Sequence, residues 1–384
     1  MVTSQSSSGA LSGLRVIDLS RVLAGPYCGQ MLGDHGAEVI KVEGPNGDDT
    51  RTWGPYKPDG ESAYYESINR NKQNVELDLS LENDRSRLRK LITTADVVIE
   101  NFKPGTMSRW GLDYERDLQP ENPQLIYCNI SGYGTNGPLA SLPGYDAALQ
   151  AYSGLMSVNG EADREPMRIG VPIVDMVTGI LSFSGILLAL HERGTSGLGQ
   201  LVDCSLLDTS LALLHPHSAQ WLTSGTLPVR TGGAHPSIAP YETFPTRNGS
   251  LFISAANDRQ FSELAGVLEA PSLLADPRFA TNGTRLSNVG ALRRIITALL
   301  VGRDRDELAA ALLQRGVAAA PVNTVEEALS SAQVQDRDMV VHLDGYRGVG
   351  IPIKLGRTPG SVRSAPASHG SDTSVVLKQI DTDL

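Results

Sequence analysis

The chain has 384 residues, of which 40% are hydrophobic and 20% are charged, a composition typical of a globular protein with two or three domains. Disordered and collagen-like chains are thereby excluded. Its 33 basic and 43 acidic residues give a net charge of −10, which disfavours nucleic acid and anionic membranes as partners. Cysteine occurs only at Cys28, Cys128 and Cys204, without a C-x-x-C pair, so we expect a reducing, cytoplasmic location.

Strand and helix patterns alternate through the first third of the chain. The Ser-rich residues 1–10 resemble no signal peptide and are expected to form a disordered tail. Branched residues predict strands at 15–20, 37–43, 74–79, 96–100 and 124–130, with helices at 26–36 and 84–94. This order predicts an α/β fold with a mostly parallel sheet. Ligands of such sheets bind beyond the carboxyl ends of the strands, here 20–24, 43–47, 101–103 and 131–134.

The remainder of the chain predicts a second, smaller domain. Residues 146–223 have a helical pattern, and 224–250 are rich in Gly, Pro and Thr. We therefore expect domains at 11–224 and 225–325, followed by 326–384, which has short strands and turns. Within the smaller domain, 251–255 is strand-like, while 260–268 and 306–316 are helical.

One apolar stretch, 169–190, has the length of a membrane span and a single charge, Asp175. Because Pro172 and Asp175 interrupt its first third, a buried core helix is the better prediction. An ionised carboxylate in these apolar surroundings is costly unless hydrogen-bond donors satisfy it. Asp175 is therefore either the N-cap of this helix or a positioned nucleophile or base.

Several common chemistries lack their motifs. The first strand is not followed by G-x-G-x-x-G, and neither a Walker lysine loop nor a G-x-S-x-G elbow occurs. His215 and His217 have no partners at zinc spacing. We therefore expect no metal and no tightly bound cofactor. Arg21, Arg70 and Lys72 are expected to be surface residues.

A series of motifs resembles the family III CoA-transferases, from about residue 11 to residue 378. The opening segment LSGLRVIDLSRVLAGPYCGQMLGDHGAEVIKVE is similar to the family's first βαβ unit. The following motifs occur in the family's order and spacing: NKQNVELDL (71–79), VVIENFKPG (97–105), ISGYGTNGP (130–138), PGYD (143–146), GVPIVDMVTG (170–179), GQLVDCSLLD (199–208), HPSIAPYETF (235–244) and PVNTVEEAL (321–329).

The resemblance implies a fold and a set of site residues. It implies a Rossmann-like large domain built from both chain ends, an inserted small α+β domain, and an interlocked homodimer. Asp175 matches the family's catalytic aspartate, and Gly232 and Gly233 match a glycine-rich lid that could stabilise an oxyanion. The positions that match coenzyme A contacts are Val22, Leu23, Ala24, Leu77, Asn101, Phe102, Lys103, Arg109, Ser131 and Tyr133.

Some positions depart from the family's pattern, and they concern the acyl specificity more than the reaction class. Gly44 and Ser131 replace basic residues of formyl-CoA transferase, the lid has only two adjacent glycines, and 369–377 differs from the usual sequence.

The resemblance implies transfer of coenzyme A from an acyl-CoA, such as succinyl-CoA, to a small carboxylic acid, which we expect to be dicarboxylic. Asp175 would attack the thioester and form an aspartyl anhydride, then an aspartyl thioester. Arg230, His235 and Arg247 are candidates for binding a second carboxylate. An acyl-CoA racemase is the nearest alternative, but Tyr145 stands where racemases carry a histidine, and tyrosine is a poor base at neutral pH. A catalytically silent coenzyme A-binding subunit is a further alternative.

Overall fold

The chain folds into two compact units. The computed structural model describes residues 9–343 and 345–382, with the side chains of 380–382 excepted, so the expected tail at 1–10 lies almost wholly outside the described residues. The larger unit contains the chain up to Leu155, Arg168–Ser218 and the chain from Ala332, and the smaller contains Met156–Met167 and Ala219–Ser331. The short segment at 156–167 joins the smaller unit, where the Gly232 amide donates to the Gly160 carbonyl at 3.1 Å.

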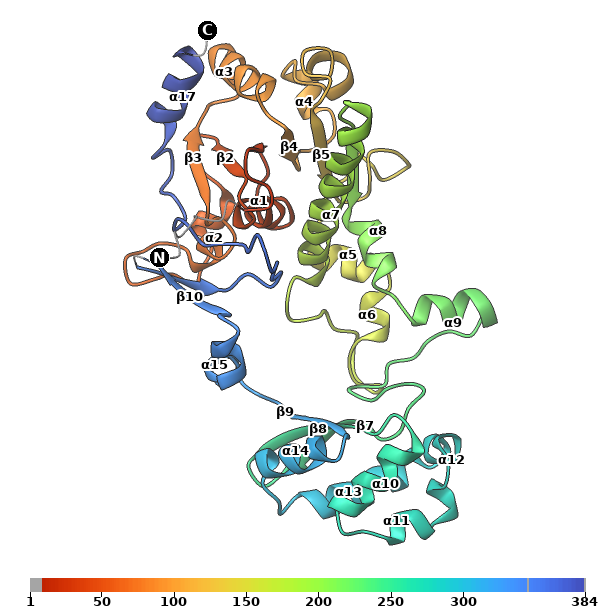
Figure 1. Cartoon of the computed structure of the whole chain (residues 1–384). Helices are drawn as coiled ribbons and strands as arrows, with labels where there is room; N and C mark the ends of the chain where they lie inside the picture. The colour runs from red at the N-terminus through yellow and green to blue at the C-terminus, as the bar shows by residue number, and fades with distance from the viewer. Residues whose placement is uncertain (1–8, 344, 383–384) are drawn as a thin grey trace. The chain divides into compact units, whose positions relative to one another are not determined.

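A six-stranded parallel sheet forms the centre of the larger unit, with strand order β3-β2-β1-β4-β5-β6 (Figure 1). Ile17 lies between Ile40 and Val98 on the neighbouring strands, as expected from the branched residues in this region. The strands are β1 (Arg15–Asp18), β2 (Glu38–Glu43), β3 (Lys72–Glu76), β4 (Val97–Glu100), β5 (Ile126–Ser131) and β6 (Leu201–Ser205). The edge strand β6 is a correction, because residues 146–223 were predicted to be helical throughout.

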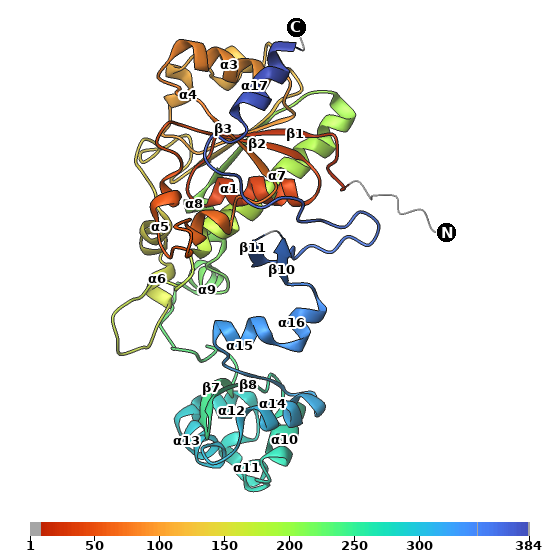
Figure 2. The ribbon, with the colours of Figure 1, turned by 90° about the vertical axis from the view of Figure 1, so that its left-hand side faces the viewer.

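Helices cover both faces of this sheet (Figures 1 and 2). On one face, α1 (Ala24–Asp34) and α7 (Ile173–Ser196) share a buried core with Val16 and Ile99. On the other face, α3 (Glu82–Thr93) and α17 (Thr373–Thr382) pack beside Ile17 and Val98. The end of the chain therefore returns to the sheet formed by its beginning.

Helix α7 is only partly buried, which corrects the expectation of a buried core helix. Val174, Phe183 and Ile186 belong to the core, whereas Ile180 and Leu188 are exposed. The helix is long and apolar enough to cross a membrane by length and composition alone, and only 39% of its most apolar window is buried in this chain.

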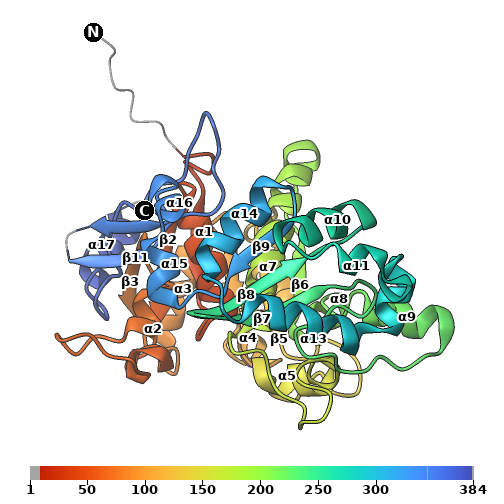
Figure 3. The same cartoon turned by 90° about the horizontal axis from the view of Figure 1, so that it is seen from below.

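The smaller unit has its own core and its own antiparallel sheet. Strands β7 (Tyr241–Thr246), β8 (Gly249–Ser254) and β9 (Ala318–Pro321) pair in that order. Helices α10 (Asp258–Val267), α13 (Val289–Leu300) and α14 (Arg305–Gln314) lie on one face of this sheet (Figure 3).

The remaining elements are short. They are η1 (Asp49–Thr52), α2 (Ala63–Glu66), α4 (Thr106–Arg109), the single-turn π-helix η2 (Tyr114–Leu118), α5 (Asp146–Tyr152), α6 (Leu155–Val158), α8 (Leu206–Ala212), α9 (His217–Ser224), α11 (Ser272–Ala275), η3 (Pro277–Phe279), α12 (Asn282–Ser287), α15 (Val325–Ser330), α16 (Ala332–Asp336), β10 (Val340–Leu343) and β11 (Tyr346–Val349).

The strand order locates the place where a ligand is expected. From β1 the chain crosses to β2 and β3 on one side, whereas β4, β5 and β6 continue on the other side. The loops after β1 and β4 therefore diverge at their carboxyl ends and leave a crevice between them.

Candidate active site

A cavity of about 160 Å³ opens at this crevice, between the loops that follow β1, β4 and β5. A neighbouring cavity of about 310 Å³ lies beyond the carboxyl ends of β2 and β3. Arg21, Asp49 and Phe102 line both, so the two cavities adjoin. Together they offer a continuous binding surface in the larger unit.

Most of the predicted site residues line these two cavities. The first cavity is lined by Asp175 together with Val22, Leu23, Ala24, Asn101, Phe102, Lys103 and Ser131. The buried Leu77 lines the second. Arg109 and Tyr133 line neither: Arg109 is exposed and bonds Thr106 at 2.9 Å, and the Tyr133 ring packs edge-on against Tyr152.

Asp175 is the third residue of α7, and its carboxyl group does not cap the helix. The N-cap position belongs to Pro172, and the first amides of α7 are accepted by Asp146, a buried residue at the start of α5. Its Oδ2 atom accepts the amides of Val174 and Asp175 at 2.8 and 3.1 Å, while Gln150 donates to its Oδ1 at 2.6 Å. The N-cap alternative for Asp175 is therefore wrong, and within residues 9–343 and 345–382 its carboxylate has no hydrogen-bond donor.

Burial and the neighbouring Asp146 carboxylate raise the pKa of Asp175 to about 7. Both causes disfavour the charged form, and no donor among the described residues offsets them. Near neutral pH the two protonation states are therefore comparably populated. Such a shift in a cavity is a frequent property of catalytic acids, bases and nucleophiles.

Two tyrosines lie near this carboxylate. Tyr145 lines the first cavity, at the position where a racemase is expected to have histidine. Burial, followed by Asp175, Asp146 and Asp48, raises the pKa of Tyr64 to about 12, so its phenol stays protonated and can donate a hydrogen bond. Sequence reasoning missed Tyr64 and Asp146 as neighbours of Asp175, because only the fold brings these segments together.

The predicted lid residues belong to the smaller unit. Gly232 has a φ of 64°, and a Cβ atom there would lie 2.6 Å from a carboxylate oxygen of Glu161. Arg230 donates to the carbonyls of Glu161 and Arg164, and Arg247 pairs with Asp304 at 3.1 Å.

Two residues that were expected at the surface are buried. Arg70 pairs with Asp34 at 2.7 Å, and Lys72 pairs with Asp18 at 2.9 Å, whereas Arg21 is exposed as expected. The physical reason is that each cation meets a carboxylate inside the fold. No group of three or more His, Cys, Asp or Glu that could hold a metal ion occurs in the described part of the chain.

Comparison with known proteins assigns the class. The model of CoA-transferase family III matches residues 11–373, and the chain belongs to this family. It has an α/β fold and the catalytic activity of a CoA-transferase.

Individual relatives match over nearly the whole chain. The chain is 43% identical to a succinate–glutarate CoA-transferase of Agrobacterium fabrum, covering 97% of this chain and 96% of that protein. It is 36% identical to the human succinyl-CoA:glutarate CoA-transferase, covering 96% and 86%. The crystal structure of a CAIB/BAIF family protein from Brucella suis superimposes with a TM-score of 0.90 at 41% identity, covering 97% of this chain and all of that one.

Proposed function

We propose that this enzyme transfers coenzyme A from succinyl-CoA, or a similar acyl-CoA, to a small dicarboxylic acid, with Asp175 as the nucleophile. The assignment of Asp175 as the nucleophile is supported by its carboxylate, which lies without a hydrogen-bond donor from the described residues in a cavity at the carboxyl ends of the strands. The substrate class is supported by relatives at 36–43% identity that are named for succinate, glutarate and D-citramalate.

The two adjoining cavities are the proposed site of coenzyme A. Phe102 lines both cavities, its ring lies at a steep angle to Trp110 with centroids 5.2 Å apart, and the Arg21 guanidinium lies 5.9 Å from its centroid; we propose that this aromatic and cationic cluster binds the adenine. Lys103 is exposed at the rim and has no partner in the described part of the chain, so its ammonium group is available for a phosphate. The thioester end then lies at Asp175, and tight binding of the nucleotide holds the thiol nearby.

The first chemical step forms an anhydride. The ionised Asp175 carboxylate attacks the thioester carbonyl, the carbon–sulfur bond breaks, and the coenzyme A thiolate leaves with the bonding pair. The product is a mixed anhydride between Asp175 and the donor acyl group. Because an anhydride is about as activated as a thioester, the acyl group's reactivity is retained.

The next steps exchange the acids. The thiolate attacks the Asp175 carbonyl, which releases the donor acid and leaves an aspartyl thioester. The acceptor carboxylate attacks this carbonyl and displaces the thiolate, giving a second anhydride. The thiolate then attacks the acceptor's acyl carbon, which yields the new acyl-CoA and regenerates the Asp175 carboxylate. No tightly bound cofactor is required. In the glycine lid that the family resemblance implies, we propose that the Gly233 amide stabilises the oxyanions, whereas the Gly232 amide would first have to leave the Gly160 carbonyl to do so.

The two alternatives have less support. Racemisation needs acid and base groups on both faces of the α-carbon, and Tyr145 in the same cavity as Asp175 is a poor base. A silent subunit has no need of a carboxylate whose pKa is raised to about 7 in a cavity.

We also propose that the enzyme is a cytoplasmic homodimer, with two chains interlocked as the family resemblance implies. The exposed apolar side chains of α7, including Ile180, Leu181 and Leu188, give a second copy of the chain a surface to cover. Sedimentation of the detergent-free protein as a dimer is the expected result. A protein that is monomeric, or soluble only with detergent, contradicts this assembly.

Transfer assays with Asp175→Ala test the function. Wild-type enzyme, succinyl-CoA and glutarate should give glutaryl-CoA, and Asp175→Ala should lower kcat by at least about 1,000-fold while still binding coenzyme A in calorimetry. Asp208→Ala, an exposed carboxylate on α8, is the matched control and should keep wild-type activity. Solvent deuterium entering the α-carbon of a branched acyl-CoA, without transfer to any dicarboxylate, would indicate a racemase.

A further inference from the structure

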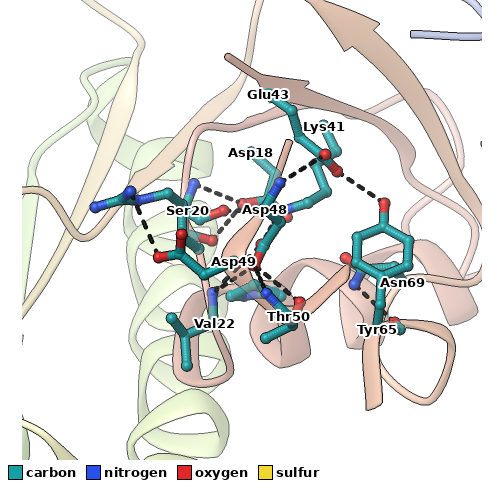
Figure 4. Close-up of polar contacts among 12 residues, drawn as sticks. Asp18, Ser20, Val22, Lys41, Glu43, Asp48, Asp49, Thr50, Tyr65 and Asn69 are labelled. Atoms are coloured by element: carbon teal, nitrogen blue, oxygen red, sulfur yellow. Dashed lines mark hydrogen bonds and ion pairs between the residues drawn. The ribbon is translucent and has the colours of Figure 1, made fainter. Parts of the chain in front are cut away.

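The loop after β1 has a backbone conformation that its own sequence disfavours. Val22, which lines the cavity of Asp175, has a φ of 71°. This left-handed conformation is rare for β-branched residues and persists only when the surrounding structure holds it. Figure 4 shows Ser20, Val22, Lys41 and Asp48 among the residues whose polar contacts it draws.

Three polar side chains hold this loop, and each of them binds the backbone of a different loop residue. The Lys41 ammonium donates to the Ser20 carbonyl at 2.7 Å. The Asn101 amide accepts from the Arg21 N–H and donates to the Arg21 carbonyl, both at 2.8 Å. The Val22 N–H donates to the Asp48 carboxylate, 3.3 Å from each oxygen. The last contact is the one made by the strained residue itself.

Asp48 is itself rigidly held. Its Oδ2 atom lies 3.0 Å from Lys41 Nζ, and both side chains are fully buried. Its Oδ1 atom accepts the amide and hydroxyl of Thr50 at 3.0 and 2.8 Å, and its own amide donates to Glu43 at 2.9 Å (Figure 4). A carboxylate that is fixed in this way fixes the N–H group that it accepts.

The cation behind Asp48 connects to the other end of the loop. Burial alone would lower the pKa of Lys41, but the carboxylates of Asp48, Asp18 and Glu43 raise it above its ordinary value, so Lys41 stays charged. Asp18 also pairs with Lys72, whose ammonium donates to the Pro26 carbonyl in the first turn of α1 at 2.7 Å. The network therefore holds the chain on both sides of residues 22–24.

The position of this loop is tied to the helix that bears the nucleophile. A Cβ atom at Gly179 would lie 2.6 Å from the Ala24 carbonyl, so α7 and the loop are in direct contact one turn after Asp175. A shift of the loop therefore changes the cavity wall facing the reacting groups.

We infer that Asp48, backed by Lys41, is a positioning residue for coenzyme A transfer, which holds Val22 in its left-handed conformation so that Val22, Leu23 and Ala24 form the cavity wall. This inference rests on the proposed site around Asp175. Asp48 borders the second cavity, but it is only 1% exposed and lies away from the reacting atoms at Asp175. Its effect is exerted through the backbone of the loop.

A double-mutant cycle with Val22→Gly tests this inference, because glycine adopts a positive φ without help. Asp48→Ala should lower kcat/KM for succinyl-CoA at least about 10-fold in the wild-type background, because loop misplacement of about 1 Å can cost far more. Val22→Gly removes a side chain from the cavity wall and so changes kcat/KM by itself; the effect of Asp48→Ala is therefore measured relative to this variant as a second parent. In that parent, Asp48→Ala should lower kcat/KM less than about 3-fold.

A control separates positioning from stability alone. Asp96 immediately precedes β4, at the amino ends of the strands and so on the far side of the sheet from the cavity. It also accepts a backbone amide, from Arg15 at 2.9 Å, and pairs with a cation, Arg193, at 2.9 Å. Asp96→Ala should lower the melting temperature but leave kcat/KM within about 2-fold. Equal losses from Asp48→Ala in both parents, or no loss in either, overturn the inference.

Two further measurements keep the test decisive. If Asp48→Ala yields no folded protein, Asp48→Asn takes its place. It should lower kcat/KM at least about 3-fold in the wild-type background and not in the Val22→Gly parent. Equal losses of kcat/KM in both parents, or no loss in either, again overturn the inference. Hydroxylamine trapping at Asp175 in the wild-type enzyme tests the proposed site independently. If Asp175 is labelled but Asp48→Ala lowers kcat/KM equally in both parents, only the role of Asp48 is rejected. If Asp175 is not labelled, the proposed site on which the inference rests is rejected.

Discussion

Replacing Asp175 by asparagine should change the pH dependence of stability in a predictable direction. In the folded chain the pKa of Asp175 is raised from 3.8 to about 7 by burial and by Asp146. Between these two values the folded state binds a proton that the unfolded state does not. The wild-type chain therefore loses stability as pH rises from about 4 to about 7, whereas Asp175→Asn cannot titrate there.

The magnitude follows from the size of the shift. Between pH 5 and pH 8, linkage gives an upper limit of about 3 kcal/mol for a pKa of about 7. Because the carboxyl group is partly accessible from its cavity, solvent screening reduces this to about 2 kcal/mol. For a unit of this size that corresponds to about 4 °C in melting temperature.

Thermal unfolding of both proteins at pH 5 and pH 8 measures this effect. The melting temperature of Asp175→Asn relative to wild type should rise by about 4 °C from the lower to the higher pH. The control is Asp49→Asn, which replaces an exposed carboxylate on the rim of the same cavity. Its melting temperature should differ from that of the wild type by the same amount at both pH values. A pH-independent difference for Asp175→Asn would refute the assignment of a raised pKa.

Two other predictions concern the surroundings of the nucleophile. Asp146→Asn removes a neighbouring negative charge, so the acid limb of the kcat/KM profile, expected near pH 7 in the wild type, should move to lower pH; an unchanged limb contradicts the coupling. Gly179→Ala should cost about 2 kcal/mol, since its Cβ would meet the Ala24 carbonyl at 2.6 Å. Gly194→Ala, with open space on the same helix, should be neutral or stabilise by up to about 1 kcal/mol. Equal melting temperatures of the two glycine variants would contradict the close packing of α1 and α7.

Local patterns were sufficient for the first five strands. Branched residues at 15–20 and an alternating pattern at 37–43 predict β1 and β2 within about two residues. The rule that ligands bind beyond strand ends then places Asn101 and Ser131 at one cavity. The edge strand β6 was missed because it has only five residues, four of which are not buried, and it lies between the helices α7 and α8.

Long-range charge pairing could not be predicted from the sequence. Lys41 and Lys72 lie on strands with ordinary alternating patterns, and their carboxylates come from β1 and from the loop after β2. Asp146 was noted only as part of a family motif, although it caps a helix that begins 27 residues later. Pairing of this kind depends on tertiary neighbours, which no local spacing reveals.

Trapping of the aspartyl intermediate tests the central claim most directly. The wild-type enzyme would be incubated with succinyl-CoA and hydroxylamine, digested, and analysed by mass spectrometry at Asp175. We expect Asp175 to be converted to its hydroxamate, with no conversion in the absence of succinyl-CoA. An enzyme that completes transfer from succinyl-CoA while Asp175 remains unmodified would contradict the covalent route through this carboxylate.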